Sequence, residues 1–400
     1  TLLVLQTIKK NNLVNPPFCA YFGGNRIWCK LMRANNNTQT QQGRNQRRKN
    51  PRAENGNRGL FAALDLGTNS CRMLIARPQG AEFEVIDAFS KPVHLGAGLA
   101  EYGTLAPSAI KRTLGALRIC SKKLRQHGVK HSRLVATEAC RRARNGTSFV
   151  NLVKRETGLN LEIIDPAEEA RLAVVSCAPH LASESNQLLI VDIGGGSTEL
   201  VWLDLSTVAP QNRARALVEL DLNKRGKAGC EKSACIMDWK SVPLGVATLK
   251  DMFHDVEDDC AKFALMSCCF EEQIDEFVPP EIGNGERCQI IGTSGTVTTV
   301  AASHLGLARY ERCKVDGVSM RKQEIDQVVQ QYLSIGPEGR RKAPCIGSDR
   351  HELIMSGSAI LQAILRVWPS SQLTVADRGL REGLLYSQMT AAGVLVNGPH

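Results

Sequence analysis

The sequence contains no hydrophobic run long enough to cross a membrane, which would take about 20 consecutive apolar residues. Its opening segment, TLLVLQTI, is short, has no basic residues before it and is followed by no cleavage-site pattern, so it does not predict a secretory signal peptide. From these two absences we expect a protein that spans no membrane and works in the cytoplasm.

The fourteen cysteines include no C-x-x-C pair. Several lie in apolar or helical runs, among them Cys120, Cys140, Cys177 and Cys268. This scatter is typical of free, mostly buried thiols in a reducing compartment, and it argues against a disulfide framework or a sulfur-ligated metal. The eight histidines are dispersed without the spacing of metal ligands, and no Ser-His-Asp arrangement can be recognised.

The net charge of +10 is confined to the first 58 residues, which hold eleven Lys or Arg and one acid. The other 342 residues carry 39 side chains of each sign, so their charge balance gives no support to nucleic-acid binding. Residues 34–58 are rich in Asn, Gln, Gly and Arg without apolar periodicity, and we assign 1–58 as a basic, disordered N-terminal tail. Such a tail is most often only solvated, with weak contact to a polyanion as the alternative.

A glycine-rich stretch at residues 188–204, LLIVDIGGGSTELVWLD, divides two apolar runs. This pattern predicts a β-hairpin whose turn carries almost no side chains. Because glycine has no Cβ, the backbone N–H groups of such a turn can approach a phosphate closely. The alternative is an ordinary glycine-rich turn beside a solvated aspartate.

Residues 61–76, FAALDLGTNSCRMLIA, align without a gap on the first sixteen residues of that stretch. Asp65 then corresponds to Asp192, and the turns have the shared pattern Asp-x-Gly-x-x-Ser. Two such copies predict two related halves that present phosphate-facing turns to one cleft.

Each residue of the two turns has a chemistry that suits this role. Asp192 stands at a strand end, where a carboxylate can hold Mg²⁺ or Mn²⁺ against a phosphate, and Asp65 is its candidate supporting ligand. Glu199 adds a second acid, which could orient water or hold the metal. The expected phosphate contacts, through backbone N–H groups or hydroxyls, are Gly67, Asn69, Ser70, Gly194, Gly195, Gly196, Ser197 and Thr198.

Strands and helices alternate after the first hairpin, which is the pattern of an α/β fold. In the second half we expect a strand at 216–221, a polar, Lys-rich loop at 223–240 and a long helix at 246–277. The Lys-rich loop and the basic residues at 340–342 are candidates for a channel that guides a polyanion.

Six ordered blocks complete the pattern: DLGTNS (65–70), ATEACRRARN (136–145), PAEEARL (166–172), DIGGGSTEL (192–200), GTSGT (292–296) and ADRGLREGLL (376–385). Together they resemble the exopolyphosphatase/guanosine pentaphosphate phosphohydrolase family, in its short, two-domain form. This family is a branch of the actin, sugar-kinase and chaperone-ATPase superfamily. The resemblance covers about residues 59–390.

The resemblance implies an α/β fold of two ribonuclease-H-like, actin-like ATPase domains with a cleft between them. Domain I would be 59–180 and domain II 181–376, and the helix in 377–400 would return to domain I. The resemblance leaves open whether the protein assembles as a homodimer.

The resemblance also implies roles for residues outside the hairpins. Arg141 matches a family arginine that contacts phosphate, and Glu169 matches the proposed water-activating glutamate, with Glu199 as the second candidate. Ser294 lies where superfamily kinases bind adenosine, but it could equally be the N-cap of a helix. Asp377, Arg381 and Glu382 are expected to be structural.

The implied activity is hydrolysis of a terminal phosphoanhydride bond, in inorganic polyphosphate or in guanosine pentaphosphate as part of the stringent response. We favour polyphosphate. The alternatives are a kinase or ATPase of the same superfamily and a regulator that binds guanosine alarmones without hydrolysing them.

Overall fold

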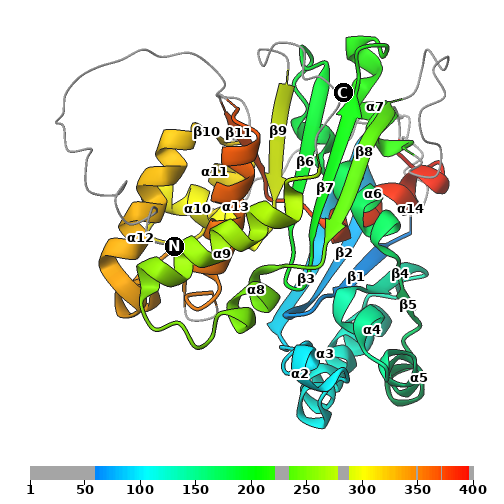
Figure 1. Ribbon diagram of the computed structural model, residues 1–400. Helices are drawn as coiled ribbons and strands as arrows, with labels where there is room; N and C mark the ends of the chain where they lie inside the picture. Colours follow the sequence, from blue (N-terminus) through cyan, green and yellow to red (C-terminus); the bar gives the residue numbers. More distant parts are fainter. Residues whose placement is uncertain (1–58, 221–233, 278–287, 348–349, 371, 396–400) are drawn as a thin grey trace, which may run out of the picture. The chain divides into compact units, whose positions relative to one another are not determined.

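The computed structural model describes residues 59–220, 234–277, 288–347, 350–370 and 372–395, and these ranges contain two β-sheets (Figure 1). The first sheet has the strand order β3-β2-β1-β4-β5. Its strands β1 to β3 are antiparallel neighbours, whereas β4 and β5 continue the sheet in parallel with β1. The strands are β1 (Phe61–Leu66), β2 (Ser70–Gln79), β3 (Glu82–Pro92), β4 (His131–Ala136) and β5 (Leu161–Ile163).

The second sheet has the order β10-β11-β9-β6-β7-β8. Without β10, its topology repeats that of the first sheet, since β6 to β8 are antiparallel neighbours and β9 and β11 run parallel to β6. The internal repeat therefore extends from the hairpin to a whole sheet. The strands are β6 (Gln187–Ile193), β7 (Thr198–Asp204), β8 (Cys235–Val242), β9 (Cys288–Thr293), β10 (Ser319–Met320) and β11 (Leu373–Ala376).

Helices cover both faces of both sheets. Helices α3 (Pro107–Gln126) and α5 (Gly146–Thr157) pack on the outer face of the first sheet. The outer face of the second sheet is covered by α9 (Asp259–Ile274), α10 (Gly295–His304), α12 (Lys322–Lys342) and α13 (Ile354–Val367). Because β6 is covered on both faces, its residues Leu188–Val191 form a continuous buried apolar run.

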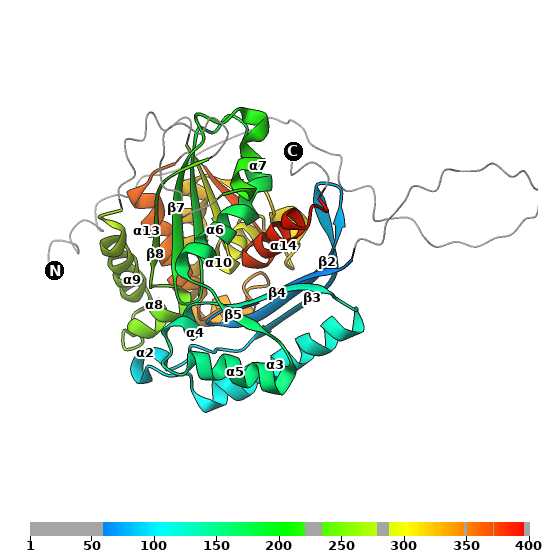
Figure 2. The same cartoon turned by 90° about the vertical axis from the view of Figure 1, so that its right-hand side faces the viewer.

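Two helices lie between the sheets, as Figure 2 shows. Helix α6 (Pro166–Cys177) packs on the second sheet and α14 (Leu380–Ala391) on the first. They cross closely, because a Cβ added at Gly383 would lie 2.2 Å from the carbonyl oxygen of Leu172. Glycine at 383 thus allows the contact that places α6, which carries Glu169, beside the cavity described below.

The shorter helical segments connect these layers. They are α2 (Leu99–Tyr102), α4 (Glu138–Arg142), α7 (Arg213–Val218), α8 (Val246–Met252), α11 (Arg312–Val315) and the 3₁₀ turns η1 (Ala178–His180) and η2 (Pro210–Asn212). Among the described helices, none is both long and apolar enough to span a membrane.

The fold class predicted from the sequence is confirmed, but two element predictions in the second half are wrong. Residues 216–218 of the segment expected as a strand at 216–221 belong to α7, and the third strand of this half, β8, begins at Cys235, within the range 223–240 that was expected as a loop. The guanidinium of Arg213 stabilises the start of α7 by donating hydrogen bonds to the carbonyl oxygens of Val208, Ser183 and Ser185.

The helix expected at 246–277 is divided into α8 and α9. Asp258 is the N-cap of α9, and its carboxylate accepts a hydrogen bond from the N–H of Ala261 at 2.7 Å, which starts a new helix. The tail at 1–58 and residues 223–233 of the Lys-rich loop lie outside the described residues. The domain boundaries at 180 and 376 stay predictions.

The ten cysteines whose side chains are described are free thiols. Cys120, Cys140 and Cys177 are buried as expected, whereas Cys268 is exposed on α9.

Candidate active site

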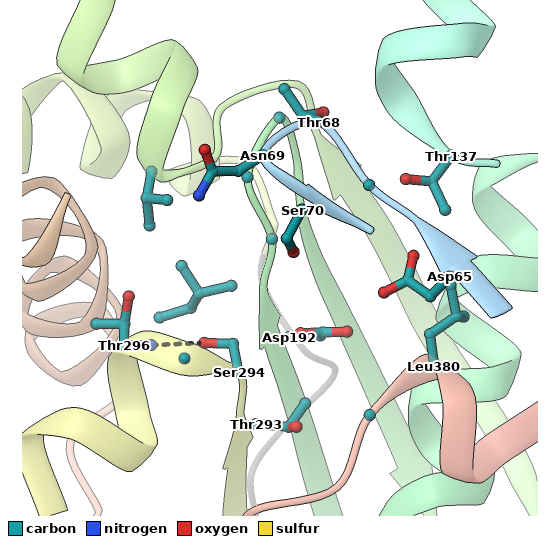
Figure 3. A pocket seen from close by; sticks show the side chains of 18 of the residues that line it. Asp65, Thr68, Asn69, Ser70, Thr137, Asp192, Thr293, Ser294, Thr296 and Leu380 are labelled. Atoms are coloured by element: carbon teal, nitrogen blue, oxygen red, sulfur yellow. Dashed lines mark hydrogen bonds between the residues drawn. The ribbon is translucent and has the colours of Figure 1, made fainter. Parts of the chain in front are cut away.

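A cavity of about 180 Å³ opens where the two hairpin turns meet (Figure 3). The carboxyl ends of β1, β6 and β9 point toward it, and crevices at such strand ends are the usual ligand sites of α/β folds. Its polar lining comprises Asp65, Gly67, Thr68, Asn69, Ser70, Arg72, Thr137, Glu138, Glu169, Asp192, Gly194, Gly195, Gly196, Ser197, Glu199, Thr293, Ser294, Gly295, Thr296, Thr298, Arg350, Asp377, Arg378, Gly379 and Arg381.

The two turns have the same backbone bond at the same aligned position. The N–H of Gly67 donates to the Ser70 carbonyl at 3.0 Å, and the N–H of Gly194 donates to the Ser197 carbonyl at 2.9 Å. Within the described residues, the N–H groups between these ends, at positions 68, 69, 195 and 196, donate no hydrogen bond. Unpaired N–H groups that line a cavity form an anion-binding site, so both turns are suited to phosphate.

The turns also contact each other. A Cβ added at Gly195 would lie 3.3 Å from the Cβ of Thr68, and one added at Gly196 would lie 2.5 Å from the Thr68 hydroxyl oxygen. Glycine is therefore required at the second and third positions of the GGG sequence for a steric reason, in addition to the exposure of the N–H groups. These glycines let the second turn approach the first.

Asp65 and Asp192 face the cavity from the ends of β1 and β6 (Figure 3). Burial raises the pKa of Asp65, and the Arg72 guanidinium opposes this shift. Burial and the charge of Asp65 raise the pKa of Asp192 to about 6. Because the charge of Asp65 raises the pKa of Asp192, the two carboxylates are close enough to attract a shared cation.

The donor set fits a divalent cation of the magnesium type. Among the described residues, no three His, Cys, Asp or Glu side chains are grouped closely enough to hold a metal alone. Mg²⁺, however, is usually bound by one or two carboxylates, with water and phosphate oxygens as its other ligands. Asp192 and Asp65 offer such a partial set beside the phosphate-binding turns.

Glu169, on the first turn of α6, also lines the cavity. Its carboxylate accepts a hydrogen bond from Arg141 at 3.0 Å. Burial raises the pKa of Glu169 to about 8, against the opposing effect of Arg141. The adjacent Glu168 is different, because it is absent from the lining and bonds to Arg133 and Arg171, which hold its pKa below its usual value despite burial.

Glu199 is a buried acid on β7, opposite Asp192 in the strand register. Its carboxylate accepts hydrogen bonds from the hydroxyls of Ser197, at 2.7 Å, and Ser241, at 2.9 Å. Burial, Glu169 and Asp192 together raise its pKa well above the usual value. The hydroxyl of Ser197 is therefore bonded to an acid, so Ser197 offers an incoming phosphate its backbone rather than a free hydroxyl.

Three predicted phosphate contacts lie differently from the rest. Arg141 is outside the lining, and its guanidinium bonds to Glu138 at 2.6 Å as well as to Glu169. Thr198 is buried and donates its hydroxyl to the Leu244 carbonyl at 2.8 Å. Ser294 is the N-cap of α10, as one of its two interpretations expected, and because it also lines the cavity its contact with a ligand stays a prediction.

The candidate channel residue Arg340 is not near the cavity. It is buried in α12 and bonds to both carboxylate oxygens of Asp259, at 2.6 and 2.9 Å. Its role is structural.

The sequence interpretation missed the positive side of the cavity. Arg72, Arg350 and Arg381 line it together, and within the described residues the guanidinium of Arg72 makes no hydrogen bond. Burial and the neighbouring Arg381 lower the pKa of Arg72. A signal was available, since the ungapped alignment pairs Arg72 with Glu199, and a hairpin closed at Gly67 and Ser70 places Arg72 opposite Asp65.

Two sheets of equal topology, with two contacting glycine turns and six acids around one cavity, define an actin-like fold whose cavity is suited to phosphate. The chain belongs to the Ppx/GppA phosphatase family, whose model matches residues 74–392.

Individual relatives agree with this assignment. The chain is 29% identical over 330 residues to the guanosine-5'-triphosphate,3'-diphosphate pyrophosphatase of Aeromonas salmonicida, and 28% identical over 330 residues to that of Aeromonas hydrophila. Each alignment covers 82% of this chain and 59% of the relative. The chain thus spans about three fifths of the length of these relatives.

Solved structures agree in fold. A crystal structure of the Aquifex aeolicus Ppx/GppA family member has a TM-score of 0.66 and 27% identity, covering 84% of this chain and 98% of that chain. An exopolyphosphatase structure from Cytophaga hutchinsonii, at 22% identity, has a TM-score of 0.67 and covers 85% of this chain and 99% of that chain.

Proposed function

We propose that this protein hydrolyses the terminal phosphoanhydride bond of a polyanionic substrate, either inorganic polyphosphate or guanosine pentaphosphate. The observation that carries the proposal is the pair of contacting turns whose free N–H groups line a cavity together with acids and arginines. The names of the Aeromonas relatives support the guanosine substrate, and membership of the Ppx/GppA phosphatase family supports polyphosphate as the other substrate.

The first task of the site is to bind and orient the terminal phosphate. The free N–H groups of Asn69, Gly195 and Gly196 offer hydrogen bonds to its oxygens. Arg72 adds an unpaired guanidinium, which suits phosphate because its planar fork can make two parallel hydrogen bonds.

The second task is to activate the water that attacks phosphorus. Glu169 is the proposed base, since it lines the cavity and a carboxylate whose pKa lies near the working pH can accept the proton of that water. The bond from Arg141 fixes the direction of the Glu169 carboxylate. Glu199 is the second candidate, but its carboxylate already accepts two hydroxyl bonds.

Mg²⁺, or Mn²⁺ in its place, would be held by Asp192 with support from Asp65. When bound, such a cation neutralises charge on the phosphate oxygens during the reaction. The chain's own residues bind and orient the substrate and deprotonate the water, and the nearby Arg72 opposes the rise in the pKa of Asp65 that burial causes.

The test is orthophosphate release from long-chain polyphosphate and from guanosine pentaphosphate, with and without Mg²⁺ or Mn²⁺. We expect release from at least one substrate, dependent on the cation. Turnover of ATP only with an added acceptor would instead indicate a kinase. Tight alarmone binding without phosphate release would indicate a regulator, and either result would overturn the proposal.

A further inference from the structure

The carbonyl oxygens of the second turn are held from behind by the start of α8. The N–H of Val246 donates to Gly194 O at 3.0 Å, and the N–H of Ala247 donates to Gly195 O at 2.8 Å. The hydroxyl of Thr248 accepts from the Gly245 N–H at 2.7 Å and lies 3.3 Å from Gly196 O, to which it can donate. Every peptide carbonyl of the GGG sequence thus has a partner on the side of α8.

The first turn is held in the same way by a segment of its own half. The N–H groups of Val93 and His94 donate to Asn69 O at 2.8 and 2.9 Å. The N–H of Gly96 donates to Thr68 O at 3.0 Å. Residues 93–96 follow β3, and residues 245–248 follow β8, which is the equivalent strand of the other sheet.

These two segments contain a second internal repeat, Leu-Gly, at 95–96 and 244–245. Both leucines are buried and fix the segment in the core. Both glycines stand against a turn, because a Cβ at Gly96 would lie 2.4 Å from the Thr68 Cγ2, and a Cβ at Gly245 would lie 2.5 to 2.6 Å from backbone atoms of Gly194, Gly195 and Gly196. Gly245 has φ −116°, so space rather than backbone conformation requires a glycine there.

Peptide geometry links these bonds to the cavity. In a trans peptide the carbonyl of one residue and the N–H of the next point in opposite directions. Anchoring the oxygens of Gly194 and Gly195 therefore directs the N–H groups of Gly195 and Gly196 away from α8, and anchoring Thr68 O does the same for the N–H of Asn69. These are the N–H groups that make no other hydrogen bond and line the cavity.

We propose that residues 93–96 and 245–248, which we call the two braces, are positioning elements that aim the phosphate-binding N–H groups of the turns. The inference rests on the proposed phosphoanhydride hydrolysis. A donor that is fixed before the substrate arrives stabilises developing negative charge without reorganisation, so the braces contribute to turnover beyond binding.

The test compares Gly245→Ala and Thr248→Val with the wild-type protein. Gly245→Ala displaces the turn backbone, and Thr248→Val removes the hydroxyl that holds Gly196 O. We expect kcat to fall about 10²-fold in Gly245→Ala, since misplacing preorganised donors by about 1 Å has effects of this size. Thr248→Val should lose less, and Thr248→Ser, which keeps the hydroxyl, should restore activity.

A control substitution at another glycine distinguishes an effect on the position of the turn from an effect on folding. Gly115, on α3, has nothing within 4 Å of an added Cβ, so Gly115→Ala should keep the wild-type kcat. In the first brace, Gly96→Ala should lose activity, and it should recover when combined with Thr68→Ser, relative to Thr68→Ser alone, because serine lacks the clashing Cγ2. Circular dichroism should show each variant folded.

Binding of inorganic tripolyphosphate, measured by calorimetry, distinguishes the two proposals. If the wild-type protein binds tripolyphosphate but releases no phosphate from any substrate, the proposed hydrolysis fails, and weaker binding by Gly245→Ala would still support the brace. If Gly245→Ala and Thr248→Val bind and turn over like the wild type, the brace is overturned. It is equally overturned if Thr248→Ser loses as much activity as Thr248→Val.

Discussion

The turns at 67–70 and 194–197 each have the same backbone hydrogen bond, a brace of their own and an aspartate at the aligned position. They differ at the position seven residues after that aspartate. There the first hairpin has Arg72, opposite Asp65, and the second has Glu199, opposite Asp192. The first hairpin therefore places a cation opposite its aspartate, and the second places a second acid there. Both turns keep the free N–H groups that suit phosphate, whereas the two acids of the second hairpin also favour a cation. The repeat thus accounts for the shared geometry, and the divergence accounts for the difference in chemistry.

The largest effect should come from a residue that belongs to neither hairpin. Glu169→Gln should lower kcat about 10²–10⁴-fold, because it removes the proposed base, while substrate binding changes little. Phosphate release under single-turnover conditions measures this effect. Glu168→Gln is the control, since its carboxylate bonds to Arg133 and Arg171 outside the cavity lining.

Glu199→Gln is the competing variant for the same step. If Glu169→Gln retains wild-type turnover and Glu199→Gln does not, the base lies in the second hairpin. The proposal that the base lies outside the two hairpins would then be wrong.

The two aspartates should be unequal although they are aligned. Asp192→Asn should reduce turnover on the order of 10³-fold and remove most of the response to Mg²⁺. The reason is that Asp192, unlike Asp65, has no cationic side chain opposite it on the next strand, so its charge is available to the metal. Asp65→Asn should cost about 10–100-fold, the usual effect of a residue that supports a metal ligand. Titration of activity with Mg²⁺ gives both values, and identical titration curves for the two variants would contradict the asymmetry.

The charge difference at the aligned position can be tested directly. Arg72→Gln should raise the KM for polyphosphate about 10-fold or more, because a charge-assisted hydrogen bond contributes about 1.5–3 kcal/mol. Arg77→Gln is the control on the same strand, where the guanidinium makes only an exposed ion pair with Glu84. An unchanged KM in Arg72→Gln would mean that the first turn binds phosphate through its backbone alone.

The smallest effect concerns the connection between the halves. Asp316 pairs with His180 at 2.7 Å and with Arg378 at 3.4 Å, and Arg378 reaches Glu82 of the first sheet. Burial alone would raise the pKa of Asp316, but these partners outweigh it and lower the pKa to about 2. Asp316→Asn should therefore destabilise the protein by about 2 kcal/mol at pH 7.

The pH dependence of that loss follows from its sign. Because the folded-state pKa lies below the unfolded one, the contribution is present above about pH 4, shrinks on acidification and is gone below about pH 2. Urea unfolding at pH 7 and pH 3.5 should thus show a smaller difference between Asp316→Asn and wild type at the lower pH. Glu219→Gln, in an exposed pair with Arg215, should change stability by less than about 1 kcal/mol at either pH.

The hairpins could be predicted because the residues that define each of them are close together in the sequence. A strand end, a turn of small residues and a second strand lie within seventeen residues, and the ungapped copy supplied the partner, so Asp65 and Asp192 were placed from the sequence alone. Their pairing at one cavity follows from two sheets of equal topology.

The features that could not be predicted depend on contacts between residues that are far apart in the sequence. The strand expected at 216–221 was wrong because residues 213–218 form α7, whose first residue, Arg213, bonds to carbonyls some 30 residues earlier. Arg141 as a phosphate ligand stays a prediction, and its bond to Glu169, 28 residues away, could not be seen in the sequence. The braces were missed for the same reason, since Leu-Gly has no meaning until β3 and β8 bring it to a turn.

The contact between Gly195 and Thr68 has a practical consequence. No hydrogen bond among the described residues joins the two turns, so this contact rests on dispersion, at about 0.1–0.2 kcal/mol for each atom pair. The approach of the two turns is therefore set by the size of the residue at position 195 rather than by a bond between them. In a Gly195→Trp protein the indole would occupy the space of Thr68, so the two turns would have to separate, and a crystal structure of that variant would show how far.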